Sequence, residues 1–231
     1  MLATIETEEP SMTDSTPIIT IPADTVLHCI SPERPALPAD APEAVVHVMN
    51  RLATWDPATA DHCGRVGELC EAFGRFLGLN EHELGVLTLA AHIHDAGKLQ
   101  VDADILTKEG KLTDGEYDTI KNHSLWGEEI LRDAGLDEEV LDIIRSHHER
   151  WDGRGYPDQL CGSEIPLAAR IIAVVDTLDA MSARRSYHRR RTNFLALAEI
   201  RRCAGSQFDP DVASAFIDFM CQRLAEDRRV A

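Results

Sequence analysis

Apolar residues recur at spacings of three and four along nearly the whole chain from residue 43 onward, and this helical period restricts the fold to helices packed on helices. The pattern predicts helices over 43–54, 57–77, 80–96, 114–134, 138–148, 166–183, 193–204 and 210–227. Start signals support several of them, among them the capping-box pair Thr113 and Glu116 and the Asp209-Pro210 step. The alternating pattern of a half-buried strand is absent over any useful length. The sequence therefore predicts an all-α domain over residues 43–231.

Two stretches inside this domain lack the helical period, residues 98–112 and the glycine-rich segment 150–165. The N-terminal residues 1–42 differ more strongly, since they hold seven of the eleven prolines and are acidic. Such a segment buries too little apolar surface to offset its ordering entropy, so we expect an acidic, proline-rich flexible tail. Its apolar residues within 17–30 remain able to dock on a partner or on the domain itself.

The charge and the cysteines exclude several classes of protein. A formal net charge of −17 argues against non-specific binding to nucleic acid or anionic lipid, because both need a basic surface. No apolar run approaches the length of a membrane span, and the acidic N-terminus does not resemble a signal peptide. The six cysteines show no C-x-x-C spacing, which favours reduced thiols. We expect a cytoplasmic protein with no nucleic acid and no membrane among its partners.

Side chains that ligate metals fall on, or at the ends of, the predicted helices. They are His62, the pair His94-Asp95, His123, the pair His147-His148 and Asp176. Ligands carried by several helices can converge in the interior of a bundle. A shell of imidazoles and carboxylates favours iron, manganese or zinc over magnesium and calcium, which prefer oxygen ligands. The placement indicates a transition-metal centre.

Helix geometry restricts how adjacent ligands act, because neighbouring residues on a helix point about 100° apart. His94 and Asp95 therefore diverge, and an aspartate beside a histidine in this way can bridge two metals. The same divergence separates His147 from His148 unless the helix frays at its end.

The helical period also indicates whether two further residues can take part in the site. Asp179 lies one turn after Asp176 and shares its face, so it can orient a ligating histidine from behind. His92 points away from the face of His94 and is not expected to be a ligand.

This constellation resembles the H…HD…D signature of the HD phosphohydrolase superfamily, and its surroundings are similar to the HD-GYP family in particular. The similar segments run in the family's order over residues 45–220. They include DPATADH at 56–62, AAHIHDAGK at 90–98, IKNH at 120–123, HHERWDGRGYP at 147–157 and VVDTLDAM at 174–181. A bare HD pair is weak evidence for the family, whereas the run at 147–157 is nearly diagnostic of it.

The resemblance implies an HD-type helical bundle with a glycine-rich GYP loop and a centre of two or three metals, often iron or manganese. Carried over by position, the metal ligands are His62, His94, Asp95, His123, His147, His148 and Asp176, with Asp95 bridging. Members with three metals carry a glutamate where this chain has Ala58, so we expect two divalent ions.

The resemblance also implies an activity, the hydrolysis of cyclic di-GMP to a linear dinucleotide (pGpG) or to GMP. Asp95 and Lys98 match catalytic positions of the family, and Arg185 and Tyr156 match positions that contact the substrate. The loop that holds Gly155 and Tyr156 is expected to bind partner domains of the diguanylate cyclase type.

Two other functions remain open. A phosphodiesterase for another cyclic dinucleotide, such as cyclic GMP-AMP, would use the same ligands and differ in pocket shape. A signalling adaptor with little turnover would act through its Gly-Tyr-Pro loop. Ser124, His188 and the 102–103 step depart from the family pattern and favour the adaptor, whereas the intact set of ligands favours an enzyme.

Overall fold

The computed structural model describes residues 37–39, 41–183 and 189–230. Within these ranges no strand forms, and two isolated bridges, Asp152 with Cys161 and Ala204 with Phe208, are the extended pairings present. The prediction of an all-α fold is confirmed. The predicted tail over 1–42 lies almost wholly outside the described residues and stays a prediction.

Ten α-helices and two 3₁₀ turns make up the described part of the chain. They are α1 (Glu43–Trp55), α2 (Pro57–Leu77), α3 (Glu81–Ile93), η1 (Ala96–Gln100), α4 (Ala103–Leu106), α5 (Asp114–Lys121), α6 (His123–Asp133), α7 (Glu138–Ser146), η2 (Gly162–Glu164), α8 (Leu167–Ala183), α9 (Arg189–Cys203) and α10 (Pro210–Val230).

Local signals in the sequence account for several of the boundaries. Asp56 accepts hydrogen bonds from the first backbone amides of α2, and Gly78 ends that helix in the left-handed conformation. The capping box expected at Thr113 and Glu116 is present at the start of α5, and Asn80 with Glu83 forms another at the start of α3.

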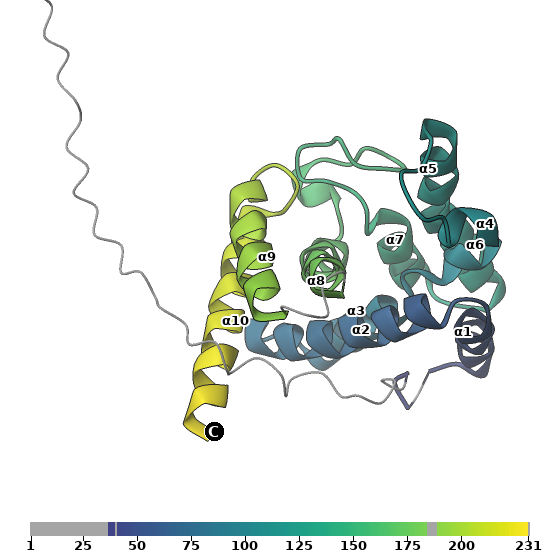
Figure 1. The fold of residues 1–231 in the computed structure, drawn as a ribbon. Helices are drawn as coiled ribbons and strands as arrows, with labels where there is room; N and C mark the ends of the chain where they lie inside the picture. The colour runs from purple at the N-terminus through teal and green to yellow at the C-terminus, as the bar shows by residue number, and fades with distance from the viewer. Residues whose placement is uncertain (1–36, 40, 184–188, 231) are drawn as a thin grey trace, which may run out of the picture.

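Helix α8 runs through the middle of the bundle (Figure 1). Helices α2 and α3 pack along one side of it, α9 and α10 along a second, and α7 along a third (Figure 1). Helix α6 packs on α7 and on η1, and α1 packs on α2 and η1. The central helix is mainly apolar, as expected for an element covered on several sides.

One hydrophobic core joins the helices of the bundle. Phe73 of α2 and Phe216 of α10 are fully buried and meet edge to face, with ring centroids 5.0 Å apart. Ile171 and Ile172 of α8 are fully buried in the same core. These apolar residues pack the helices against one another and form the scaffold of the site.

Three predicted helices end or break earlier than the period alone indicates. Helix α3 ends at Ile93 instead of continuing to 96, and α7 ends at Ser146 instead of 148. The predicted helix over 114–134 is interrupted at Asn122 and forms α5 and α6. Each of these changes places one or two histidines at a helix terminus.

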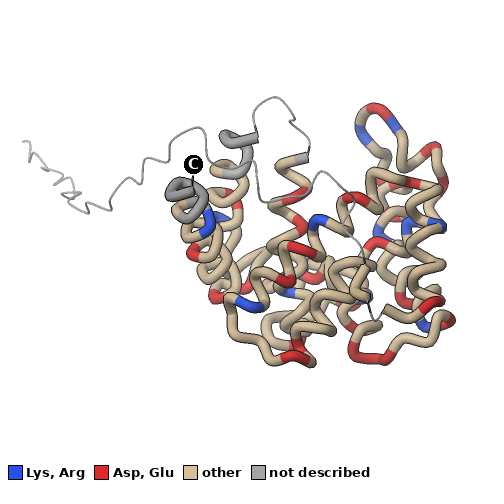
Figure 2. The backbone as a smooth tube through the Cα atoms, turned by 90° about the horizontal axis from the view of Figure 1, so that it is seen from below, with Lys and Arg blue, Asp and Glu red and all other residues tan. Residues whose placement is uncertain are grey.

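Acidic residues occur along the whole described backbone, with lysines and arginines between them (Figure 2). None of the helices in the described ranges is both long enough and apolar enough to span a bilayer.

Candidate metal centre

Seven histidine and aspartate side chains from five parts of the fold meet beside α8. His62 comes from α2, His94 and Asp95 from the end of α3 and the turn after it, His123 from the first turn of α6, His147 and His148 from the end of α7, and Asp176 from α8. Their potential ligand atoms form two groups, and within each group all atoms lie within 4.8 Å of one another. The sequence placed these residues up to 114 positions apart (176 minus 62), and the fold brings them together.

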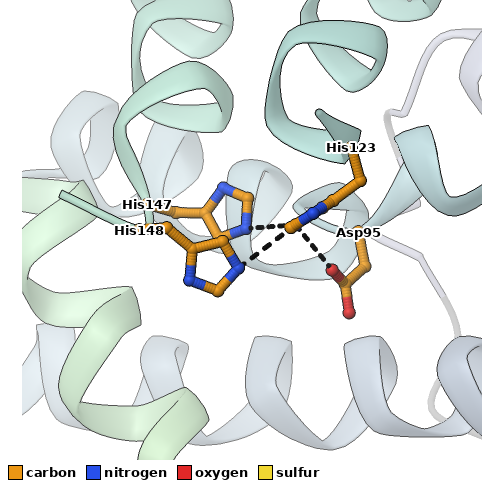
Figure 3. A group of neighbouring side chains, drawn as sticks. All are labelled: Asp95, His123, His147 and His148. Atoms are coloured by element: carbon orange, nitrogen blue, oxygen red, sulfur yellow. Dashed lines mark hydrogen bonds and ion pairs between the residues drawn. The ribbon is translucent and has the colours of Figure 1, made fainter. Parts of the chain in front are cut away.

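The first group consists of Asp95, His123, His147 and His148 (Figure 3). The Nε2 atom of His123 lies 3.1 Å from Nε2 of His147, 3.1 Å from Nε2 of His148 and 3.3 Å from Oδ1 of Asp95. His147 and His148 come together because α7 ends before them, with ring centroids 4.1 Å apart. The fraying considered from the sequence therefore occurs.

The backbone fixes which nitrogen of these rings faces inward. Nδ1 of His123 donates to the carbonyl of Ile120 and Nδ1 of His147 to that of Ile144, each at 2.6 Å. Burial lowers the pKa of His123, and burial together with neighbouring imidazoles lowers the pKa of His147 to about 3, so both rings are neutral. Their Nε2 lone pairs consequently face each other, an arrangement that a bound cation stabilises.

The second group consists of His62, His94 and Asp176. Nε2 of His62 lies 3.0 Å from Oδ1 of Asp176, and Nδ1 of His94 donates to the carbonyl of Ala91 at 2.8 Å, which turns the Nε2 of His94 inward. Burial acts to lower the pKa of His62, but hydrogen bonds to two aspartates outweigh it and raise that pKa to about 10. A cation in this group therefore competes with a proton for Nε2 of His62.

Asp95 lies between the two groups and presents one carboxylate oxygen to each. Oδ1 faces His123, whereas Oδ2 lies 3.5 Å from Nε2 of His94 and 3.8 Å from Nε2 of His62. Lys98 places Nζ 2.6 Å from the same Oδ2. Although burial alone would raise the pKa of Asp95, Lys98 and the surrounding histidines hold it well below its usual range. The carboxylate is ionised and in position to bridge two cations.

A pair of residues behind His62 fixes the orientation of its ring. Oδ2 of Asp179 lies 2.7 Å from Nδ1 of His62, and Arg65 donates to both oxygens of Asp179 at 2.8 Å. Burial opposes ionisation of Asp179, but the hydrogen bonds from Arg65 and His62 lower its pKa to about 2. An orienting role was expected for Asp179 from the sequence, whereas none was assigned to Arg65, whose position one turn after His62 was the available signal.

Gly97 allows the Asp95 segment to approach α6. A Cβ atom on Gly97 would lie 1.9 Å from the carbonyl oxygen of His123 and 2.4 Å from the backbone nitrogen of Gly127. No side chain fits at this distance, so only glycine lets η1 pack directly on the backbone of α6. This contact sets the separation of Asp95 from His123.

The other residues considered in the sequence lie at different places relative to the two groups. The ring of Tyr156 packs on that of His148, with centroids 4.9 Å apart and planes inclined by 30°. Arg185 lies outside the described residues. His92 is buried and packs against Gly67, away from the two groups. Cys63 was not expected at the site, but it is a buried thiol whose Sγ lies within 4.8 Å of ligand atoms of His94 and Asp95.

The donors fit a pair of divalent transition metals. The two groups offer five imidazoles and two carboxylates, which is a mixed nitrogen and oxygen shell. Nε2 of His123 and Nε2 of His147 lie 3.1 Å apart with no hydrogen between them, because Nδ1 of each ring donates to a backbone carbonyl. This contact is the observation that most favours a cation in the first group.

Comparison with known proteins agrees with the fold. A family model described as HD domain matches residues 45–212. A 3'3'-cGAMP-specific phosphodiesterase of Vibrio cholerae is 34% identical over 185 residues, covering 79% of this chain and 35% of the relative. A cyclic di-GMP phosphodiesterase response regulator of Xanthomonas campestris is 37% identical over 179 residues, covering 76% of this chain and 47% of the relative.

A solved structure supports the same fold. A cyclic GMP-AMP-specific phosphodiesterase of V. cholerae superposes with a TM-score of 0.58 at 21% identity, covering 80% of this chain and 52% of that one. The prediction of an HD-type bundle is confirmed. The chain spans less than half the length of the two curated relatives.

Proposed function

Since this chain belongs to the HD domain family, we propose that it is a metal-dependent phosphodiesterase that hydrolyses cyclic di-GMP to a linear dinucleotide or to GMP. The observation that carries this proposal is the position of Asp95, whose two oxygens face separate groups of histidines. A bridging carboxylate between two imidazole clusters is suited to a two-metal phosphodiester hydrolase.

The proposal includes two divalent ions, iron or manganese, held by the seven side chains of the two groups. Bound ions of this kind lower the pKa of a coordinated water and neutralise charge on the phosphoryl oxygens. By formal counting, two divalent cations and the carboxylates of Asp95 and Asp176 leave a charge of about +2, which attracts an anionic substrate to an otherwise acidic protein.

Lys98 supplies a further positive charge at the site. Burial acts to lower its pKa, but the carboxylate of Asp95 outweighs this effect and raises it, so the ammonium group is charged at neutral pH. Its Nζ lies beside the oxygen of Asp95 that faces the second group, where it can stabilise charge that develops on a leaving oxygen. Tyr156, packed on His148, is proposed to contact the substrate, as is Arg185.

Two relatives support different cyclic dinucleotides as the substrate. The X. campestris relative is named for cyclic di-GMP and the V. cholerae relative for 3'3'-cGAMP, and their identities to this chain are similar. We rank cyclic di-GMP first because most of the similar proteins carry that name, and 3'3'-cGAMP is the second candidate. Both substrates present the same phosphodiester to the same ligands.

The test is a hydrolysis assay with matched variants. Protein purified without oxygen and loaded with ferrous or manganous ion would be incubated with each cyclic dinucleotide, and products would be separated by anion-exchange chromatography. We expect hydrolysis by the wild type and none by a His94→Ala/Asp95→Ala variant.

The possible outcomes separate the candidates. Preference for 3'3'-cGAMP would retain the reaction and change the substrate. A wild type that binds two ions but forms no product above the variant would favour the low-turnover adaptor, which acts through the loop of Gly155 and Tyr156 on a partner such as a diguanylate cyclase. A cytoplasmic location also belongs to this proposal.

A further inference from the structure

The tip of the GYP loop is tied to the bundle by one arginine of α7. Arg145 donates from Nε to Oδ2 of Asp158 at 2.5 Å and from NH2 to Oδ1 of the same residue at 2.8 Å. Its remaining nitrogen, NH1, donates to Glu128 of α6 at 2.7 Å. Two parallel bonds between a planar guanidinium and a carboxylate fix orientation as well as distance. Asp158 is therefore held in one position relative to α6 and α7.

The fixed position of Asp158 also limits the conformation of Tyr156, which lies two residues earlier in the chain. The backbone amide of Asp158 donates to the buried carboxylate of Glu149 at 2.7 Å, which fixes the backbone at the same residue. Gly155 lies so close that a Cβ atom there would be 2.5 Å from Cα of Glu149. Tyr156 lies between these two fixed residues and has little conformational freedom. Its ring packs on His148 of the first group.

The base of the loop is anchored independently of Arg145. The amides of Trp151 and Asp152 donate to the carbonyls of Gln207 and Ser206 at 3.1 and 2.8 Å. At the tip, by contrast, the backbone bond from Tyr156 to the carbonyl of His148 is long, at 3.4 Å. Two side chains therefore restrain the tip at Asp158. Glu149 accepts from its backbone amide, and Arg145 pairs with its carboxylate and so joins the tip to α7.

The exposure of this pair indicates what it contributes. The side chains of Arg145 and Asp158 are 32% and 36% exposed, and ion pairs of this kind add little to global stability. Neither residue belongs to the hydrophobic core, so its loss leaves the scaffold intact. What the pair supplies is the geometry of the loop.

We infer that Arg145 is a positioning residue, which holds Tyr156 at the metal centre through Asp158 and so sets the affinity for the cyclic dinucleotide. This inference rests on the proposed function. It extends the site to Arg145 on the exposed side of α7, a residue for which no role was predicted.

The test compares Arg145→Ala with Arg132→Ala. Arg132 is a matched control because it pairs with the same Glu128 and with Glu138, but makes no contact with the loop. We expect Arg145→Ala to raise the KM for the cyclic dinucleotide about tenfold, with kcat within about twofold of wild type and metal content unchanged. Arg132→Ala should leave both constants as in the wild type.

A double-mutant cycle identifies the route. If Arg145 acts through Asp158, Asp158→Ala should raise KM to a similar extent, and Arg145→Ala in that background should add nothing. Arg145→Lys, which keeps the charge without the two parallel bonds, should restore KM only in part. Additive effects, or an equal change of KM in Arg132→Ala, would overturn the inference.

Hydrogen exchange of the backbone separates this inference from the proposed function. The amides of residues 155, 156 and 158–160 should exchange faster in Arg145→Ala than in wild type or Arg132→Ala, whatever the substrate is. Unchanged exchange would overturn the restraint even in an active enzyme. Faster exchange in a protein without cyclic dinucleotide hydrolysis would support the restraint while the proposed function fails.

Discussion

At the scale of single residues, the most demanding feature is the group of imidazole nitrogens around His123. Nε2 of His123 lies 3.1 Å from Nε2 of both His147 and His148, while backbone carbonyls occupy Nδ1 of His123 and His147. Neutral rings of His123 and His147 in this arrangement oppose lone pair to lone pair, which is unfavourable in a buried site with low dielectric. The apolar core around them holds the rings in this arrangement, ready for a cation.

The first prediction concerns His123→Ala. Because His123 contacts every other member of its group, we expect the metal content to fall from about two to about one ion per chain and turnover to fall at least about a thousandfold. Metal analysis and the hydrolysis assay measure both. His82→Ala is the control, since His82 is an exposed histidine that pairs with Glu139. Full metal content in His123→Ala would contradict the assignment of the first group.

A second prediction concerns the support behind His62. Asp179→Asn keeps the shape of the side chain but weakens its hydrogen bonds to His62 and Arg65. We expect the affinity for metal to fall about 10- to 100-fold while all seven ligands remain. Titration of the metal-free protein measures this change. Asp118→Asn, at an exposed position of α5, should leave the affinity unchanged, and an equally unaffected Asp179→Asn would remove any orienting role for Asp179.

At the scale of secondary structure, the sequence predicted where helices form better than where they end. The capping box of Thr113 and Glu116 is local chemistry, and the structure confirms it. The break at Asn122 has no local signal, because it accompanies the close packing of Gly97 on the carbonyl of His123, a contact between segments about 26 residues apart (123 minus 97). Tertiary contacts of this kind are not encoded in a helical period.

The ligand pairs show the same limit. In an ideal helix, His147 and His148 would point in different directions. Both rings reach His123 because α7 ends at Ser146. The residue types and their order were sufficient to predict which side chains gather. The division into two groups around Asp95 required the three-dimensional arrangement of the helix ends.

A third prediction tests the contact between η1 and α6. Gly97→Ala would place a methyl group 1.9 Å from the carbonyl oxygen of His123, so the two backbones must separate. We expect a loss of stability of about 3 kcal/mol, together with weaker metal binding. Urea unfolding monitored by circular dichroism measures the stability.

Gly115→Ala is the matched control for this substitution. Gly115 lies in α5 and a Cβ atom there would meet nothing within 4 Å, so alanine should stabilise the protein by about 0.5–1 kcal/mol through helix propensity. If Gly97→Ala proved as harmless as Gly115→Ala, the close approach of η1 to α6 would not exist in solution.

At the scale of the whole molecule, the core and the metal centre are separable. The buried apolar residues extend from α1 to α10, and a chain of 231 residues is large enough to fold on such a core without metal. The protein should therefore differ from small zinc-dependent domains, which unfold when the ion is removed. Metal should add stability to a structure that is already folded.

The last prediction follows from the number of segments that the ions would connect. The ligands come from five separate segments of the chain, which are α2, the turn after α3, α6, the end of α7 and α8. A ligand that binds only the folded state stabilises it by about 2.7 kcal/mol at a concentration of 100 Kd. For a domain of this size, that gain corresponds to a rise in Tm of roughly 5–10 °C.

Calorimetry of the chelated protein with and without manganous ion would measure the rise, and the chelated sample should itself melt in a cooperative transition. A His94→Ala/His123→Ala variant loses one ligand from each group and should show almost no rise. An equal rise in this variant would mean that the ions bind to other acidic groups of this strongly negative chain, since its exposed carboxylates would be unaffected by both substitutions.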